Sequence, residues 1–283
     1  MTQYGQQYGV PPLGLPPVPA PRRLALELVL DLVILVIAVI VTAIGLIGAI
    51  IAVRMATQGL SAAEVARLGA TDQLALLGAG GVLLVVLAQN ALFVAVPVLR
   101  TRLLRREPLA AIGLQAPQPL RLVLFGFGLG ALLLAGNVLL GLLFSSFGIR
   151  QNQAEQYPLF AGDYLGQALF LLGVGLIAPI GEEVLFRGYV FNTLRRIGAG
   201  SAWGLPAAYL LSALLFGAAH VLSATEGVIA LIVPTIVMGI ALAWSVHRTG
   251  SLVPSIIAHA INNSVALLAL VTCVNNPGIC PGV

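Results

Sequence analysis

Charge is what this sequence has least of. Asp, Glu and Arg together make up 8% of 283 residues, lysine is absent, and all fourteen basic residues are arginines. A soluble domain carries about 25% charged residues. Hydrophobic residues reach 59%, and the mean hydropathy is +1.02. The scarcity of charge excludes a soluble globular domain, and the scattered arginines form no basic patch for nucleic acid. We predict an all-α polytopic membrane protein.

Cysteine is also scarce, with only Cys273 and Cys280. They lie seven residues apart around Pro277 and Gly278, near the end of the chain. In an oxidising compartment they could close a small disulfide loop, and two unpaired thiols are the alternative.

Apolar runs define the predicted membrane spans, because a span needs about 20 apolar residues. We expect a bundle of about seven transmembrane helices, and eight helices with a re-entrant piece are the alternative. In the fourth run, Pro179 followed by Gly181 predicts a break. The runs are 24–53, 73–99, 119–147, 163–193, 206–222, 226–246 and 252–273.

Arginine placement predicts the orientation. Arginines flank alternate ends of the seven runs, and cytoplasmic loops are the ones enriched in Arg and Lys. The N-terminus is therefore expected in the cytoplasm and the C-terminus outside, in a multi-pass protein of the plasma or cytoplasmic membrane. The arginines expected on the cytoplasmic side are Arg22, Arg23, Arg100, Arg102, Arg105, Arg106, Arg195, Arg196 and Arg248.

Composition divides the chain into four parts. Residues 1–23, rich in Gln, Tyr, Gly and Pro, predict a disordered cytoplasmic tail. The first apolar run is too long for a signal-peptide core, so we expect it to be retained. N-terminal transmembrane helices (24–147), a second transmembrane core (160–273) and a short C-terminal tail (274–283) follow.

Several small or polar residues lie inside the spans. Gly126, Gly128 and Gly130 are not a dinucleotide fingerprint, because no strand precedes them. We expect them to let helices approach closely. Asn90 and Asn137 are single polar residues within spans, for which hydrogen bonds between helices are the simplest interpretation.

The stretch GEEVLFRGYVF, residues 181–191, concentrates charge within the fourth run. Each charge deep in a bilayer costs about 2.5–3.5 kcal/mol on insertion scales. Glu183 and Arg187 are four residues apart, so a helix places them on one face as an ion pair. Glu182, rotated by about 100°, is expected to point elsewhere. The alternative is that these charges mark the water-exposed end of a helix.

Two of the three histidines have a partner four residues away. Phe216 and His220 end the fifth run, and His259 and Asn263 share one face in the seventh. A lone membrane histidine is usually a hydrogen-bonded packing residue, and His247 beside an arginine is interpreted as an interface residue. Two such pairs in addition to a glutamate pair favour a shared site.

In this order, GEEVLFRG, FGAAH and HAINN resemble the motifs EExxxR, FxxxH and HxxxN of the CPBP family. That family comprises the type II CaaX prenyl endopeptidases and their bacterial relatives, also called the ABI family. The resemblance covers about residues 160–270, and every motif position is filled. It implies an intramembrane active site that hydrolyses a peptide bond.

The resemblance implies a role for each acidic motif residue. Glu182 would be the general base, with a pKa raised by its low-dielectric surroundings. His220 would orient the same water or share its proton. Glu183, paired with Arg187, would hold the helix and tune Glu182.

The third motif would stabilise the transition state. His259 and the Asn263 amide can donate hydrogen bonds to the oxyanion that forms on the scissile carbonyl. Phe216 would support the site.

Zinc is the competing mechanism. Glu182, Glu183, His220 and His259 could supply the three ligands of a catalytic zinc ion. The signature HExxH is absent, however, and Asn263 is a poor zinc ligand. We therefore favour a glutamate mechanism without a cofactor.

Two other classes of function remain open. A non-catalytic membrane scaffold or bacteriocin-immunity-type protein would share the fold, and a proton-coupled transporter would use the glutamates and histidines as a relay. The expected partners are a peptide or membrane-protein substrate and the lipid bilayer, with no nucleic acid. The sequence identifies neither the substrate nor any role of prenylation.

Overall fold

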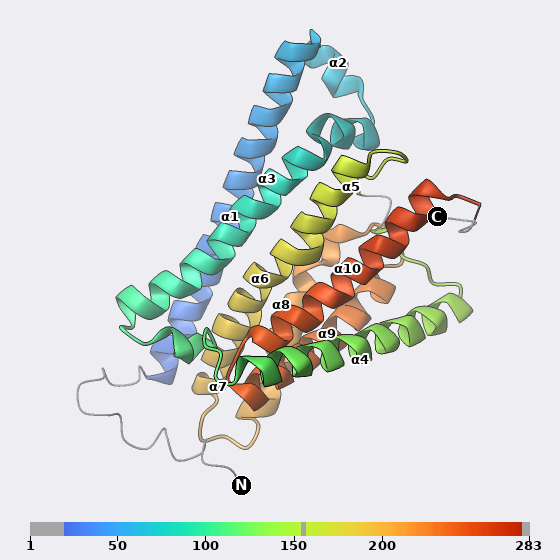
Figure 1. Ribbon diagram of the computed structural model, residues 1–283. Helices are drawn as coiled ribbons and strands as arrows, with labels where there is room; N and C mark the ends of the chain where they lie inside the picture. The colour runs from blue at the N-terminus through green and yellow to red at the C-terminus, as the bar shows by residue number, and fades with distance from the viewer. Residues whose placement is uncertain (1–19, 154–156, 279–283) are drawn as a thin grey trace.

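The computed structural model describes residues 20–153 and 157–278, and within these ranges it contains helices and no strand (Figure 1). The prediction of an all-α fold is confirmed. The predicted tail up to residue 19 lies outside the described residues, as does Cys280, so the disordered tail and the disulfide stay predictions. Cys273 lies in the last helix, α10.

Among the residues that the structure describes, six helices are long and apolar enough to cross a membrane. Most are single elements, but one is assembled from five consecutive elements. Their bounds are Pro21–Gln58 (α1), Ala75–Leu104 (α3 and its π-helical end), Pro119–Ser146 (α4), Tyr164–Ile197 (α5 to α7), Val228–Thr249 (α9) and Val253–Asn275 (α10). These six correspond to six of the seven predicted runs.

The remaining run forms a shorter helix. Helix α8, Gly204–Ala219, has 16 residues and is therefore about 24 Å long, less than the roughly 30 Å of a hydrocarbon core. Short helical segments also lie in the connections: α2 (Ala62–Arg67) follows α1, the 3₁₀ turn Leu109–Ile112 follows α3, and the 3₁₀ turn Val221–Ser223 follows α8.

Local residue chemistry explains where α1 begins and where α1 and α9 end. Pro21 occupies the first turn of α1, where its missing N–H is not needed, so the helix begins two residues before Arg23. Gly59 ends α1 and Gly250 ends α9, with φ of 70° and 68°. This left-handed conformation costs glycine little and other residues more.

The central helix, Tyr164–Ile197, is not broken at Pro179, contrary to the prediction. Ala178, Glu182 and Glu183 keep helical φ values between −53° and −67°. Pro179 instead follows a π-helical segment, Leu171–Ile177 (η5), and a second one, Glu183–Phe191 (η6), begins after the glutamate pair. Proline has no N–H to donate, and the wider π turns accommodate this missing hydrogen bond without ending the helix.

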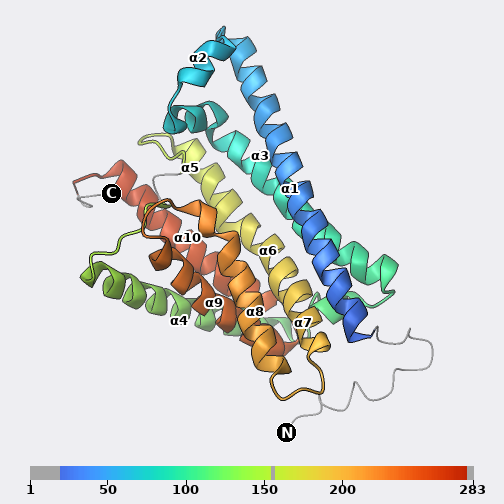
Figure 2. The same ribbon diagram turned by 180° about the vertical axis from the view of Figure 1, so that it is seen from behind.

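The N-terminal helices lie on two sides of the central helix. Helices α1 and α3 run side by side, whereas α4 crosses the far side of the bundle and packs against α10 (Figures 1 and 2). A Cβ atom at Gly126 or Gly130 would come within 2.9 Å of Ile257 or Ile261 of α10, so both glycines permit this contact, as predicted. At Gly128, by contrast, a Cβ atom would meet no neighbouring atom within 4 Å, so this glycine permits no such contact.

Both predicted asparagine contacts between helices are confirmed. The Asn90 side chain of α3 accepts a hydrogen bond from the Gly181 N–H at 2.8 Å. Asn137 of α4 donates to the Asn262 side chain of α10 at 2.6 Å.

A buried polar cluster joins the first helices to the central helix. Arg100 donates two hydrogen bonds to Asp31 of α1, and Tyr189 of the central helix donates to the same carboxylate. Arg105 pairs with Glu27 at 3.0 Å and lies over the Tyr189 ring. These two arginines, interpreted from the sequence only as markers of orientation, are therefore also structural.

Candidate active site

The Glu183–Arg187 ion pair lies in the interior of the bundle. An Arg187 Nη1–H donates to Glu183 Oε1 at 2.9 Å, as the four-residue spacing predicted. Both side chains are 0% exposed. The alternative that these charges mark the water-exposed end of a helix is therefore wrong.

His259 of α10 brings the two glutamates together. Its Nδ1 lies 2.8 Å from Glu183 Oε1, and its Nε2 lies 3.7 Å from Glu182 Oε2. The expectation that Glu182 points elsewhere is wrong, since adjacent carboxylates face the two nitrogens of one ring. Glu182 and Glu183 both keep helical dihedral angles, so the convergence depends on the position of the His259 ring between their side chains.

The charges determine the direction of the hydrogen bond from His259. Glu183 is held as a carboxylate by Arg187, so the His259 Nδ1–H donates and the carboxylate accepts. The Nε2 atom then faces Glu182. Glu182 Oε2 and Glu183 Oε2 are both buried without a hydrogen-bond partner. Buried polar atoms of this kind are rare, and these two mark a place where water or substrate polar groups would bind.

Phe216 joins the three motifs. This fully buried ring lies 3.9 Å beneath the Arg187 guanidinium, 4.8 Å from the His220 ring and 5.6 Å from the His259 ring. The His259 contact is edge-to-face, at 89°. Phe216 therefore packs against one residue of each motif.

His220 and Asn263 lie at the margin of this arrangement. His220 Nδ1 donates to the Phe216 carbonyl at 2.9 Å, which leaves Nε2 as an acceptor in the neutral ring. Asn263 donates to the Val174 carbonyl at 3.3 Å. Within the described part of the chain, no hydrogen bond or ion pair joins either residue to the glutamates.

Tyr157, which the sequence analysis did not single out, lies close enough to Glu182 to respond to its charge. The ring packs on Phe170, with centroids 4.9 Å apart. Burial raises the pKa of Tyr157 to about 12, and the negative charge of Glu182 adds to the shift. No sequence signal would have found this residue, because it lies in a polar loop outside the three motifs.

The candidate zinc ligands do not form a three-ligand group. Among the residues that the structure describes, no set of three or more His, Cys, Asp or Glu side chains is arranged to hold a metal ion. Glu183 Oε1 is already shared between Arg187 and His259.

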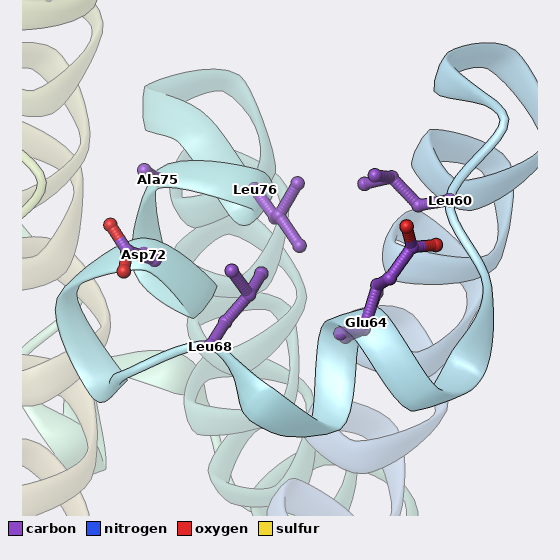
Figure 3. A pocket seen from close by; sticks show the side chains of 7 residues that line it. Leu60, Glu64, Leu68, Asp72, Ala75 and Leu76 are labelled. Atoms are coloured by element: carbon purple, nitrogen blue, oxygen red, sulfur yellow. The ribbon is translucent and has the colours of Figure 1, made fainter.

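A surface pocket of about 290 Å³ lies elsewhere, where α1, α2 and α3 meet (Figure 3). It contains none of the motif residues. Its lining includes Leu60, Glu64, Val65, Leu68, Asp72 and Leu76.

Comparison with known proteins supports the resemblance carried by the motifs. Residues 164–265, which contain all three motifs, match the family model described as type II CAAX prenyl endopeptidase Rce1-like. A relative, the UPF0177 protein YxdF of Lactococcus lactis subsp. lactis (strain IL1403), is 29% identical over 104 residues. That match covers 36% of this chain and 51%, or about half, of the relative. No solved structure matches the chain. The chain is thus an integral, multi-pass membrane protein, and its residues 164–265 form a segment that is similar to the Rce1-like type II CAAX prenyl endopeptidases.

Proposed function

We propose that this protein is an intramembrane endopeptidase, in which Glu182 activates a water molecule to hydrolyse a peptide bond. The observation that carries the proposal is the placement of His259 between two adjacent glutamates, 2.8 Å from one and 3.7 Å from the other. A structural ion pair needs only Glu183 and Arg187. Glu182, with a buried oxygen that has no hydrogen-bond partner among the residues that the structure describes, is surplus to that pair.

In the proposed reaction, Glu182 takes a proton from water, and the water oxygen bonds to the scissile carbonyl carbon. The carbonyl oxygen becomes an oxyanion. The carbon–nitrogen bond then breaks, and the proton held by Glu182 passes to the leaving amine. The His220 Nε2 acceptor would orient the water, and Phe216 would fix the distance between His220 and His259.

The oxyanion would be stabilised by His259 and Asn263. Because the His259 Nδ1–H is donated to Glu183, Nε2 can also donate only when the ring carries both protons. The two glutamates stabilise that imidazolium. The Asn263 amide has a second N–H beside the one donated to Val174, and this second hydrogen is the one the oxyanion would use.

The proposal needs no cofactor and sends no step through zinc. The substrate is a peptide or a membrane-protein segment. We also propose that the N-terminus lies in the cytoplasm and the C-terminus outside, on the arginine distribution described above.

The proposal is tested by cleavage of a quenched peptide library by the purified, detergent-solubilised protein. Glu182→Ala and wild type with a strong zinc chelator are measured in parallel. We expect activity that is lost in Glu182→Ala and retained with the chelator. Activity lost with the chelator and restored by zinc would overturn the metal-independent mechanism. No cleavage by folded wild type would favour a non-catalytic scaffold.

A further inference from the structure

Two asparagines outside the Rce1-like segment contact the two helices that carry the candidate site. Asn90 belongs to α3 and Asn137 to α4, whereas the family match begins only at residue 164. Each contacts the residue immediately before a proposed active-site residue. Asn90 bonds to Gly181, which precedes Glu182, and Asn137 bonds to Asn262, which precedes Asn263.

The Asn90 contact holds the backbone at Glu182. The Asn90 side chain is 7% exposed, and its Nδ2 donates to the Val86 carbonyl at 3.1 Å while Oδ1 accepts from Gly181. A Cβ atom at position 181 would lie 2.3 Å from Asn90 Oδ1, so only glycine permits this approach. Since Glu182 Oε2 has no hydrogen-bond partner, the position of this carboxylate depends on the backbone that Asn90 holds.

The Asn137 contact holds α10, the helix that carries His259 and Asn263. Consecutive residues of α10 reach to opposite sides: Asn262 accepts from Asn137 of α4, and Asn263 donates to Val174 of the central helix. The asparagine pair therefore sets the rotation of α10 between its two neighbours. His259, four residues before Asn263, lies on the same face and depends on the same rotation.

We propose that Asn90 and Asn137 are positioning residues, through which α3 and α4 set the distance between the base, Glu182, and the His259–Asn263 pair. This inference rests on the proposed function. Because the two contacts come from different sides of the bundle, α3 and α4 are part of the active-site framework.

A matched control is available in the same bundle. Gln167 of α5 is also buried, and its side chain bonds to Asn275 at the end of α10 at 3.0 Å. This contact is likewise an amide pair between helices, but neither residue adjoins a motif. Gln167→Leu therefore reports the cost of losing such a contact without displacing the site.

The first measurement is kcat and KM of the full-length protein on a peptide that wild type cleaves. We expect Asn90→Leu and Asn137→Leu to lower kcat about 10- to 100-fold, with KM changed less than about twofold, because small displacements of reacting groups cost this much. Gln167→Leu should keep its kcat. Asn90→Gln and Asn137→Gln, which retain the amide group, should recover more of the activity than the leucine variants. Equal kcat values in all three leucine variants would overturn the inference while leaving the proposed function intact.

The second measurement is hydrogen exchange, which does not depend on activity. Fragments that contain Gly181 should exchange faster in Asn90→Leu than in wild type or Gln167→Leu. Unchanged exchange there would overturn the role of Asn90, whatever the activity. Faster exchange in Asn90→Leu, together with a wild type that cleaves no peptide, would support the contact and refute the proposed function separately.

Discussion

Helix α1 is more apolar than the central helix, and yet the central helix is the more deeply buried of the two. The most apolar stretch of α1 has a mean hydropathy of 3.1, and only 6% of its residues are buried inside the protein. The central helix has a lower mean hydropathy of 1.9, yet 56% of its most apolar stretch is buried. A helix that faces lipid must be apolar, whereas one enclosed by other helices can carry polar groups that protein partners satisfy.

The comparison also holds within α1. Its only two acidic residues, Glu27 and Asp31, lie on the face turned toward the protein, where Arg105 and Arg100 pair with them. For these two acidic residues, a charge within the helix therefore marks a contact with another helix.

The most sensitive position of the central helix is Glu182. Glu182→Gln should lower the cleavage rate by about two to four orders of magnitude, because it removes the general base. Folding should be retained, since the side chain makes no hydrogen bond through Oε2. Initial rates measure the effect, and Glu64→Gln, in the short helix α2, is the control. A Glu182→Gln enzyme with more than a tenth of wild-type activity would contradict the assignment.

The buried ion pair should dominate stability. Arg187→Met leaves Glu183 as an uncompensated buried charge and should cost about 3–5 kcal/mol. Arg23→Gln removes an ion pair whose arginine side chain is 67% exposed and should cost less than about 1 kcal/mol. Unfolding in mixed micelles measures both changes. Equal losses of unfolding free energy in the two variants would show that burial does not distinguish the ion pair of the central helix from that of α1.

The α1 cluster should give an intermediate effect. Asp31→Asn removes the charge that Arg100 and Tyr189 share and should cost about 1.5–3 kcal/mol in the same unfolding assay. Val41→Ala, on the exposed part of α1, is the control and should change stability by less than about 1 kcal/mol. No loss in Asp31→Asn would show that the cluster is not structural.

The smallest effect at neutral pH is expected at Tyr157. With a pKa of about 12, raised from 10, the folded protein keeps the phenol proton over a range where the unfolded chain releases it. This contribution to stability is complete below pH 10 and is lost as the pH rises towards 12. Tyr157→Phe should remove that dependence and change stability at pH 7 by less than about 1 kcal/mol. An unchanged alkaline profile would place the phenol in water instead.

Much of this architecture follows from the order of the residues. Low charge and long apolar runs predicted the helical membrane class, and a spacing of four predicted the Glu183–Arg187 pair. The close packing permitted by Gly126 and Gly130 was also predictable, because small residues allow helices to approach. These features are local or depend only on composition.

Local rules failed where the helix geometry changes. A proline usually kinks a helix, but the π-helical segment before Pro179 keeps the central helix continuous. A 100° rotation per residue separates adjacent side chains, but His259 contacts both glutamates because its two ring nitrogens face different carboxylates.

Only the tertiary structure decided which distant residues meet. His259 lies 76 residues from Glu183 in the chain, and Arg100 lies 69 from Asp31. No periodicity connects such positions, because their contact depends on how whole helices cross and rotate. The sequence by itself determined which residues are candidates for the chemistry and which neighbours share a helix face. The packing of α3, α4, α8 and α10 around the central helix determined that Glu182, Glu183, Phe216 and His259 form one enclosed cluster.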